Sequence, residues 1–153
     1  MFVLSGKSLF RWAVASIVDT GFLVGLLDGS DPYHEWCLSV APEVKGPWLT
    51  AEACIVEAVH CLQGKALPAR SRLFDWMDRA LLVSQHSLPE RRGIVFAEMN
   101  RYRGRNVDFA DACLVSLSDE YPRMPLVTTD ARDFSVYLRG RTPRKLITLP
   151  VGT

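Results

Sequence analysis

The sequence predicts an α/β protein of three layers, with a central parallel sheet flanked by helices. Short apolar runs rich in β-branched residues alternate with longer segments whose apolar residues recur at helical spacing. The runs are continuous rather than alternating, which is typical of strands that are covered on both faces. Strands that alternate with helices form parallel sheets with right-handed crossovers, so functional groups belong at the carboxyl ends of the strands.

The first half of the chain contains two strands and three helices in our prediction. The first strand is the run AVASIV, and an apolar segment after it continues into a short helix. Asp31 and Pro32 are typical of a helix start, as N-cap and first helical residue. Thr50 can cap the third helix and Gly64 can end it. In chain order we expect strand, helix, helix, strand and helix at residues 13–18, 22–27, 32–40, 47–49 and 51–63.

The second half supplies three strands and four helices. Ile94, Val95 and Met99 form the apolar stripe of one helix, and Asp108 opens the next. The runs PLVT and KLIT are the last two strands. In chain order we expect helix, strand, helix, helix, strand, helix and strand at residues 68–79, 81–84, 89–102, 108–120, 125–128, 130–137 and 145–148.

Length and composition place the chain among compact globular proteins. Of its 153 residues, 48% are hydrophobic and 23% are charged, which excludes a disordered or low-complexity chain. We expect one domain over residues 14–150, preceded by a leader or extension at residues 1–13. No uncharged stretch approaches the roughly 18 residues that span a bilayer, so we expect no membrane association and a cytoplasmic location.

Charge and cysteine content narrow the function classes further. Lysine and arginine number 18 against 17 acidic residues, so the net charge of +1 indicates neither a non-specific nucleic-acid binder nor an acidic tail. The four cysteines form no C-x-x-C pair, and no histidines follow at zinc-finger spacing, so we expect no zinc site. Thiols in apolar stretches favour core positions in a reducing cytosol over disulfides.

Two of the predicted parallel strands are followed by an aspartate. Asp19 comes directly after the first strand, and Asp130 follows the run PLVTT. Residues just past such strands lie at the rim where ligands bind, so the two carboxylates converge if their strands are neighbours. Each aspartate could also be only a helix cap or a turn residue.

Three further carboxylates belong to predicted helices. Asp108 and Asp111 lie in the first turn of one helix, where the helix dipole stabilises acidic residues. Asp108 could be only an N-cap, whereas Asp111 precedes an apolar segment and should lie near the buried side. Glu57 lies in an otherwise nearly apolar helix, so it either points to solvent or is held over the sheet by a partner.

Together, Asp19, Glu57, Asp111 and Asp130 offer hard oxygen ligands without a histidine cluster or a thiolate pair. Such ligands favour Mg²⁺ or Mn²⁺. Crowded carboxylates without a cation are costly or take up protons, so the set predicts a divalent-metal site. Phosphodiester hydrolysis is the matching chemistry, because a bound metal activates water and offsets charge on the leaving oxygen.

Four segments resemble the PIN-domain nucleases, and within them the VapC-like toxins of type II toxin–antitoxin systems. They occur in the family's order and approximate spacing, and each alone is a weak match. The segments are IVDTGFLVGLLD at 17–28, TAEACIVEAVHCL at 50–62, VDFADACLVSLSDEY at 107–121 and LVTTDARDF at 126–134. The resemblance covers residues 14–150 and implies a PIN-like fold.

The resemblance also implies metal-dependent cleavage of single-stranded or looped RNA. It puts the family's acidic catalytic quartet at Asp19, Glu57, Asp111 and Asp130, with Asp19, Asp111 and Asp130 as ligands of the metal. It puts hydroxyls that orient these carboxylates at Thr20 and Thr128, and more variable acidic positions at Asp108 and Asp133. The chain departs from the pattern at Gly21, where the family often has Asn or Ser.

Partners follow from the same resemblance. It implies a homodimer and an antitoxin whose C-terminal segment covers the active site. Because an acidic site repels RNA until metal binds, basic residues elsewhere should contact the substrate. The candidates are Arg101, Arg103, Arg105 and Arg132, followed by Arg139, Arg141, Arg144 and Lys145.

Two alternatives to a nuclease stay open on the sequence. One is a PIN-like binding module without catalysis, which metal titration would separate from an enzyme. The other is an aspartate-based phosphoacceptor or phosphatase domain. A phosphatase of that kind has D-x-D after its first strand, whereas this chain has Asp19, Thr20 and Gly21 there.

Overall fold

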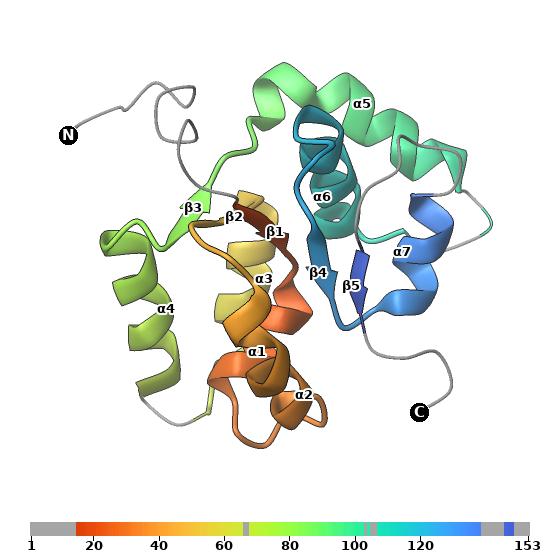
Figure 1. The fold of residues 1–153 in the computed structure, drawn as a ribbon. Coiled ribbons are helices and arrows are strands. Elements are labelled where there is room, and N and C mark those ends of the chain that lie inside the picture. The colour runs from red at the N-terminus through yellow and green to blue at the C-terminus, as the bar shows by residue number, and fades with distance from the viewer. Residues whose placement is uncertain (1–14, 66–67, 103, 105–106, 139–145, 149–153) are drawn as a thin grey trace.

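The computed structural model describes residues 15–65, 68–102, 104, 107–138 and 146–148, and the predicted leader at residues 1–13 lies outside them. Five strands form one parallel sheet in the order β3-β2-β1-β4-β5 (Figure 1). They are β1 Ser16–Val18, β2 Trp48–Thr50, β3 Leu82–Ser84, β4 Leu126–Thr128 and β5 Leu146–Thr148. Each begins and ends close to a predicted strand, so the predicted parallel sheet is confirmed.

The helices also follow the predicted order. They are α1 Thr20–Leu27, α2 His34–Val40, α3 Glu52–Cys61, α4 Pro68–Asp78, α5 Leu88–Arg101, α6 Phe109–Glu120 and α7 Ala131–Tyr137, with a 3-10 turn at Ala41–Glu43. The predicted caps of two helices are wrong. Asp31 accepts a hydrogen bond from the Tyr33 backbone at 2.8 Å, and α2 begins only at His34. Thr50 belongs to β2, where its hydroxyl donates to the Val18 carbonyl at 2.8 Å.

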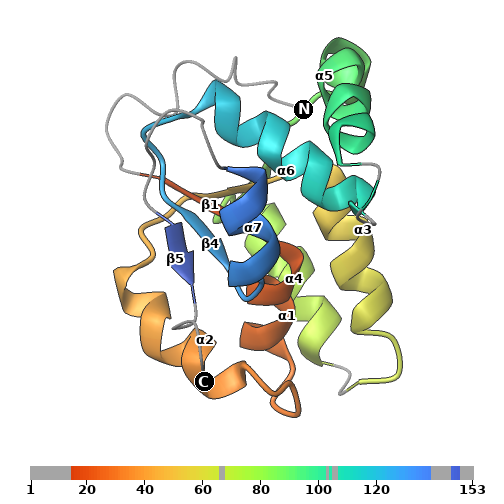
Figure 2. The ribbon, with the colours of Figure 1, turned by 90° about the vertical axis from the view of Figure 1, so that its right-hand side faces the viewer.

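Successive residues of the central strands face opposite layers. Ile17 and Leu126 belong to the core that α5, α6 and α7 cover, whereas Val18 and Val127 belong to the core under α1, α2 and α4. All four side chains are fully buried, which explains why β1 and β4 are apolar runs without alternation. The α7 helix lies beside β4 and β5 in both views (Figure 1, Figure 2). The three-layer architecture is therefore confirmed.

The pairing of β1 with β4 fixes where their carboxyl ends lie. Ile17 pairs with Leu126 and Val18 with Val127, and the Asp19 backbone N–H donates to the Val127 carbonyl at 3.1 Å. The strands that precede the two strand-end aspartates are thus neighbours, as the sequence argument requires.

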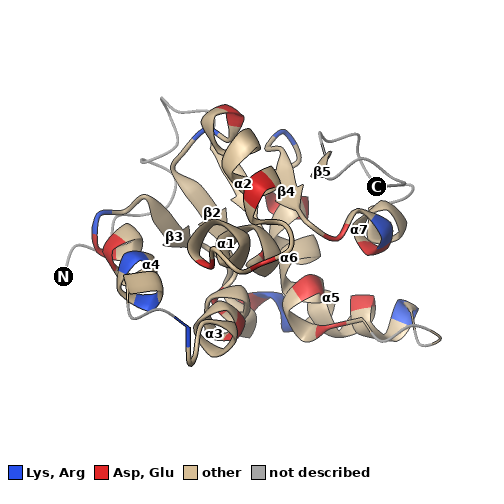
Figure 3. Cartoon of the chain, turned by 90° about the horizontal axis from the view of Figure 1, so that it is seen from below, with Lys and Arg blue, Asp and Glu red and all other residues tan. Residues whose placement is uncertain are grey.

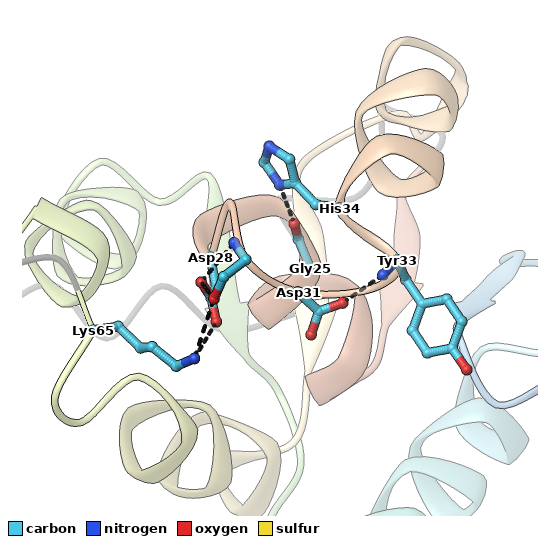
Figure 4. A network of polar contacts seen from close by, with 7 residues as sticks. Gly25, Asp28, Asp31, Tyr33, His34 and Lys65 are labelled. Atoms are coloured by element: carbon cyan, nitrogen blue, oxygen red, sulfur yellow. Dashed lines mark hydrogen bonds and ion pairs between the residues drawn. The ribbon is translucent and has the colours of Figure 1, made fainter.

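At the other end of α1, Asp28 ties the helix to the segment after α3 (Figure 4). The backbone N–H of Ser30 donates to Asp28 Oδ1 at 2.9 Å and its hydroxyl donates at 2.7 Å. The Lys65 ammonium lies 3.0 Å from the other oxygen, Oδ2. Nearby, His34 Nδ1 hydrogen-bonds the Gly25 carbonyl at 2.6 Å, which anchors the start of α2 to α1.

The cysteines are free thiols in the structure. Cys37, Cys54 and Cys113 are buried and Cys61 is exposed. Burial raises the pKa of the Cys37 and Cys54 thiols to about 12, so they stay protonated and pack as small core residues. None of the described helices is both long enough and apolar enough to cross a membrane.

Candidate active site

A cavity of about 390 Å³ opens at the carboxyl edge of the sheet. Six of the side chains around it are carboxylates, and we call it the acidic cavity. It is lined by Asp19, Thr20, Gly21, Glu57, Cys61, Asp108, Asp111, Thr129, Asp130 and Asp133. Figure 3 looks onto this edge and shows acidic segments around α1, α3, α6 and α7. The structure thus brings together the four carboxylates that the sequence proposes as catalytic.

Asp19 is held at the end of β1 by three hydrogen bonds. Its Oδ1 accepts from the Phe22 backbone N–H at 2.7 Å, which makes Asp19 the N-cap of α1. The Thr128 hydroxyl donates to Oδ2, and the Thr129 backbone N–H also donates to the carboxylate. Even so, burial raises the pKa of Asp19 to about 6, because the side chain is only 6% exposed.

Asp130 lies across from Asp19 at the end of β4. The Thr128 hydroxyl accepts a hydrogen bond from the Asp130 backbone N–H at 2.9 Å and donates one to Asp19. Thr128 therefore links the ends of β1 and β4. Asp130 Oδ1 accepts from the Asp133 backbone N–H at 2.9 Å and caps α7. The negative charge of Asp130 contributes to the raised pKa of Asp19, so the two carboxylates repel each other.

Glu57 reaches the acidic cavity from the middle of α3. The Thr20 hydroxyl, at the start of α1, donates to Glu57 Oε2 at 2.6 Å. Of the two alternatives for Glu57, the structure therefore shows the one in which a partner holds the carboxylate. Thr20 orients Glu57 in the same way that Thr128 orients Asp19.

Asp108 and Asp111 have different surroundings in the first turn of α6. Asp108 is exposed and caps the helix, accepting from the Ala110 backbone N–H at 2.8 Å. Asp111 is half-buried, and among the described residues no hydrogen bond or ion pair engages its carboxylate. Burial and then neighbouring charges raise the pKa of Asp111 to about 7. The neighbours that repel it are Asp108, Asp19, Asp130 and Glu57.

The donors of the acidic cavity fit a hard divalent cation. Apart from the Cys61 thiol they are carboxylate and hydroxyl oxygens. Burial is the largest cause of the raised pKa values of Asp19 and Asp111, and no lysine or arginine of the described residues offsets it. In the described part of the chain, no three acidic, histidine or cysteine side chains meet closely enough to enclose an ion by themselves. Mg²⁺ keeps several waters and uses only one or two carboxylates, so it does not need such an enclosure.

Three residues line the acidic cavity without having been predicted to act there. Gly21 and Thr129 lie side by side in its wall, since a Cβ on Gly21 would lie 2.1 Å from Thr129 Oγ1. Cys61 stands one helical turn after Glu57 on α3, and this i, i+4 spacing is a pattern that could have identified it. His60 instead lines a neighbouring groove with Val56 and Phe109.

The basic residues are placed only in part. Arg132 is exposed in the first turn of α7, between Asp130 and Asp133, which line the acidic cavity. Arg101 is exposed at the end of α5, and its guanidinium lies 5.8 Å from the centroid of the Tyr102 ring. The remaining candidates, Arg103, Arg105, Arg139, Arg141, Arg144 and Lys145, lie outside the described residues.

The sheet order, the helices on both faces and the carboxylates at one edge define a three-layer α/β fold of the PIN-like kind. Among solved structures, the chain is similar to the VapC20 toxin of Mycobacterium tuberculosis, which is described as cleaving the sarcin-ricin loop. The TM-score is 0.69 at 16% sequence identity, and the match covers 80% of this chain and 95% of VapC20. The chain therefore has the fold of a VapC toxin.

Comparisons by sequence add nothing to this likeness. No protein-family model matches the chain, and no curated protein matches it. At 16% identity the likeness to VapC20 is one of fold.

Proposed function

We propose that this chain is a metal-dependent endoribonuclease that acts as the toxin of a toxin–antitoxin pair. The observation that carries the proposal is Asp111, a half-buried carboxylate that faces other carboxylates and has no cation beside it among the described residues. Such an arrangement is costly unless a metal ion joins it. The fold shared with a toxin that cleaves the sarcin-ricin loop supports RNA as the substrate.

In this proposal Asp19, Asp111 and Asp130 hold Mg²⁺ or Mn²⁺, directly or through waters that the ion keeps, and Glu57 completes the site. The bound ion would supply the activation of water and the neutralisation of charge on the phosphate. The chain's own residues provide the arrangement. Thr128 fixes the spacing of Asp19 and Asp130 by its two hydrogen bonds, and Thr20 directs Glu57 into the cavity.

The substrate backbone would be held outside the ring of carboxylates. We assign this role to the exposed Arg132 beside the cavity and to the cluster Arg101, Arg103 and Arg105 that precedes α6. Positive side chains near an acidic metal site bring the phosphates close without neutralising the metal ligands.

A cytoplasmic homodimer and an antitoxin complete the proposal. A groove of about 510 Å³ next to the acidic cavity runs between α3 and the start of α6, with Val56 65% exposed and Phe109 37% exposed. Glu57 and Asp108 line both the groove and the cavity. An antitoxin segment with apolar residues and one basic side chain would fit the groove and the cavity together.

Cleavage of an RNA panel by the purified chain tests the proposal. We expect cleavage with Mn²⁺, none in excess chelator, and recovery when Mn²⁺ is restored. Asp111→Asn should lower the rate about 100-fold or more, because the amide removes a ligand charge. Asp78→Asn, on an exposed residue at the end of α4, is the matched control and should cleave normally. Cleavage that survives the chelator, or an unaffected Asp111→Asn, would contradict the proposal.

A further inference from the structure

Two side chains at the acidic cavity compete for one volume. A Cβ on Gly21 would lie 2.1 Å from Thr129 Oγ1 and 3.4 Å from Thr129 Cβ. The first distance is far below a non-bonded carbon–oxygen contact of about 3.3 Å. The Thr129 hydroxyl therefore occupies the place that a side chain at position 21 would take.

The shared volume lies beside Asp19. The same Cβ on Gly21 would be 3.6 Å from Asp19 Oδ1. The Thr129 backbone N–H donates to the Asp19 carboxylate, which fixes residue 129 against it. The hydroxyl therefore enters the cavity from the end of β4 and fills the space above the first turn of α1.

Thr129 differs from Thr128 in what its hydroxyl can do. The Thr128 hydroxyl is fully buried and already bonded to Asp19 and the Asp130 backbone. Thr129 is half-buried and lines the cavity, and no hydrogen bond among the described residues uses its hydroxyl. A neutral oxygen there adds a donor and an acceptor without adding charge to a cavity that already holds six carboxylates.

We propose that Thr129 is a positioning residue of the candidate metal site. Gly21, which has no side chain, leaves the space that the Thr129 hydroxyl occupies. The inference rests on the proposed function, because the hydroxyl would act on a water or phosphate oxygen beside the metal. The space beside Asp19 holds one hydroxyl. It can come from residue 129 after β4 or from residue 21 in α1, but not from both at once.

Substitutions at both positions, measured by Mn²⁺ calorimetry and by the thermal midpoint without metal, test the inference. Thr129→Val keeps the shape and removes the hydroxyl, so it should weaken Mn²⁺ binding about tenfold with little change in the midpoint. Thr129→Ser should bind as the parent chain does. Gly21→Ser should weaken binding and lower the midpoint because of the clash.

The combined substitution gives the sharpest outcome. Gly21→Ser with Thr129→Ala moves the hydroxyl to α1, so it should restore both readings above those of Gly21→Ser alone. Gly29→Ser is the matched control, since a Cβ there meets nothing within 4 Å. Unchanged Mn²⁺ binding in Thr129→Val, or effects of the two substitutions that simply add, would overturn the inference. A parent chain that binds no Mn²⁺ would instead overturn the proposed function, and this inference with it.

Discussion

Two aspartates mark the two ends of α1, and their surroundings are opposite. Asp19 is 6% exposed, and burial raises its pKa to about 6. Asp28 is 9% exposed, yet hydrogen bonds from Ser30 and the ammonium of Lys65 lower its pKa to about 2. The accessible surfaces are nearly the same, but burial is the largest cause of the raised pKa of Asp19, whereas at Asp28 the hydrogen bonds from Ser30 and the Lys65 ammonium outweigh burial.

The two aspartates thus differ in whether the fold supplies a cation. Asp28 has an ion-pair partner, whereas Asp19 has hydrogen-bond donors but no cation among the described residues. Asp28 has a cation 3.0 Å away, supplied by the segment after α3. Asp19 receives only neutral donors and is repelled by Asp130. Among the described residues no lysine or arginine lowers the pKa of Asp19, and in the function proposed above a bound metal ion would supply the positive charge.

The largest expected effect is on RNA cleavage. Asp19→Asn keeps the cap of α1, because the amide oxygen can still accept from Phe22, but it removes a ligand charge and should lower the rate about 100-fold or more. Asp28→Asn should leave the rate within about threefold, as its carboxylate lies outside the acidic cavity. Equal losses in the two variants, measured with Mn²⁺ under single-turnover conditions, would erase the distinction.

The next effect is on stability without metal, where the two aspartates should act in opposite directions. The pKa of Asp19 is raised, so the unfolded chain loses this proton first and stability falls as the pH rises from 3.8 to about 6. The rise of the Asp19 pKa from 3.8 to about 6 corresponds to a loss of about 3 kcal/mol in the free energy of unfolding at neutral pH. Asp19→Asn should therefore stabilise the chain near neutral pH and not below about pH 4.

Asp28 contributes with the other sign. Its pKa is lowered, so its stabilisation is present above pH 3.8 and is lost as the pH falls to about 2. Asp28→Asn should therefore destabilise the chain near neutral pH. Urea unfolding in chelator at several pH values measures both effects, and shifts in the same direction would break the comparison.

A smaller effect follows from giving the cavity a cation of its own. Cys61 lines the acidic cavity, and burial followed by the charge of Glu57 raises the pKa of its thiol. Cys61→Lys should stabilise the metal-free chain by about 1 kcal/mol and weaken Mn²⁺ binding about tenfold, since the ammonium competes with the metal. Cys61→Met introduces a side chain of about the length of lysine without its charge. It should neither stabilise the metal-free chain nor weaken Mn²⁺ binding. Tighter Mn²⁺ binding in the lysine variant would contradict the account.

The smallest effect concerns the ion pair at the far end of α1. The Lys65 side chain is 42% exposed, so Lys65→Met should cost about 1 kcal/mol or less. Mn²⁺ binding should not change, because the pair lies away from the acidic cavity. A loss of metal binding in this variant would show that the two ends of α1 are not independent.

The sequence predicts the strand ends well because local rules decide them. Asp19 and Asp130 follow buried apolar runs, and parallel strands bring such positions to one edge. The structure also shows that capping a helix and lining the cavity are compatible roles. Three aspartates do both, namely Asp19, Asp108 and Asp130.

Contacts between distant segments could not be predicted in the same way. The approach of Gly21 to Thr129 depends on β1 lying beside β4, and no local pattern encodes that order. The pairing of Asp28 with Lys65 depends likewise on where the turn after α3 passes. The cap predicted at Asp31 failed because an aspartate can bond its own turn as readily as a helix end.

Mn²⁺ calorimetry on the parent chain at about pH 8 and about pH 5.5 tests the central claim most directly. Binding should be present at the higher pH, absent in Asp111→Asn and retained in Asp28→Asn. Affinity should fall at least about tenfold at the lower pH, because protons compete for Asp19 and Asp111, whose pKa values are about 6 and about 7. Absent binding, or binding that ignores both the pH and Asp111→Asn, would contradict the account.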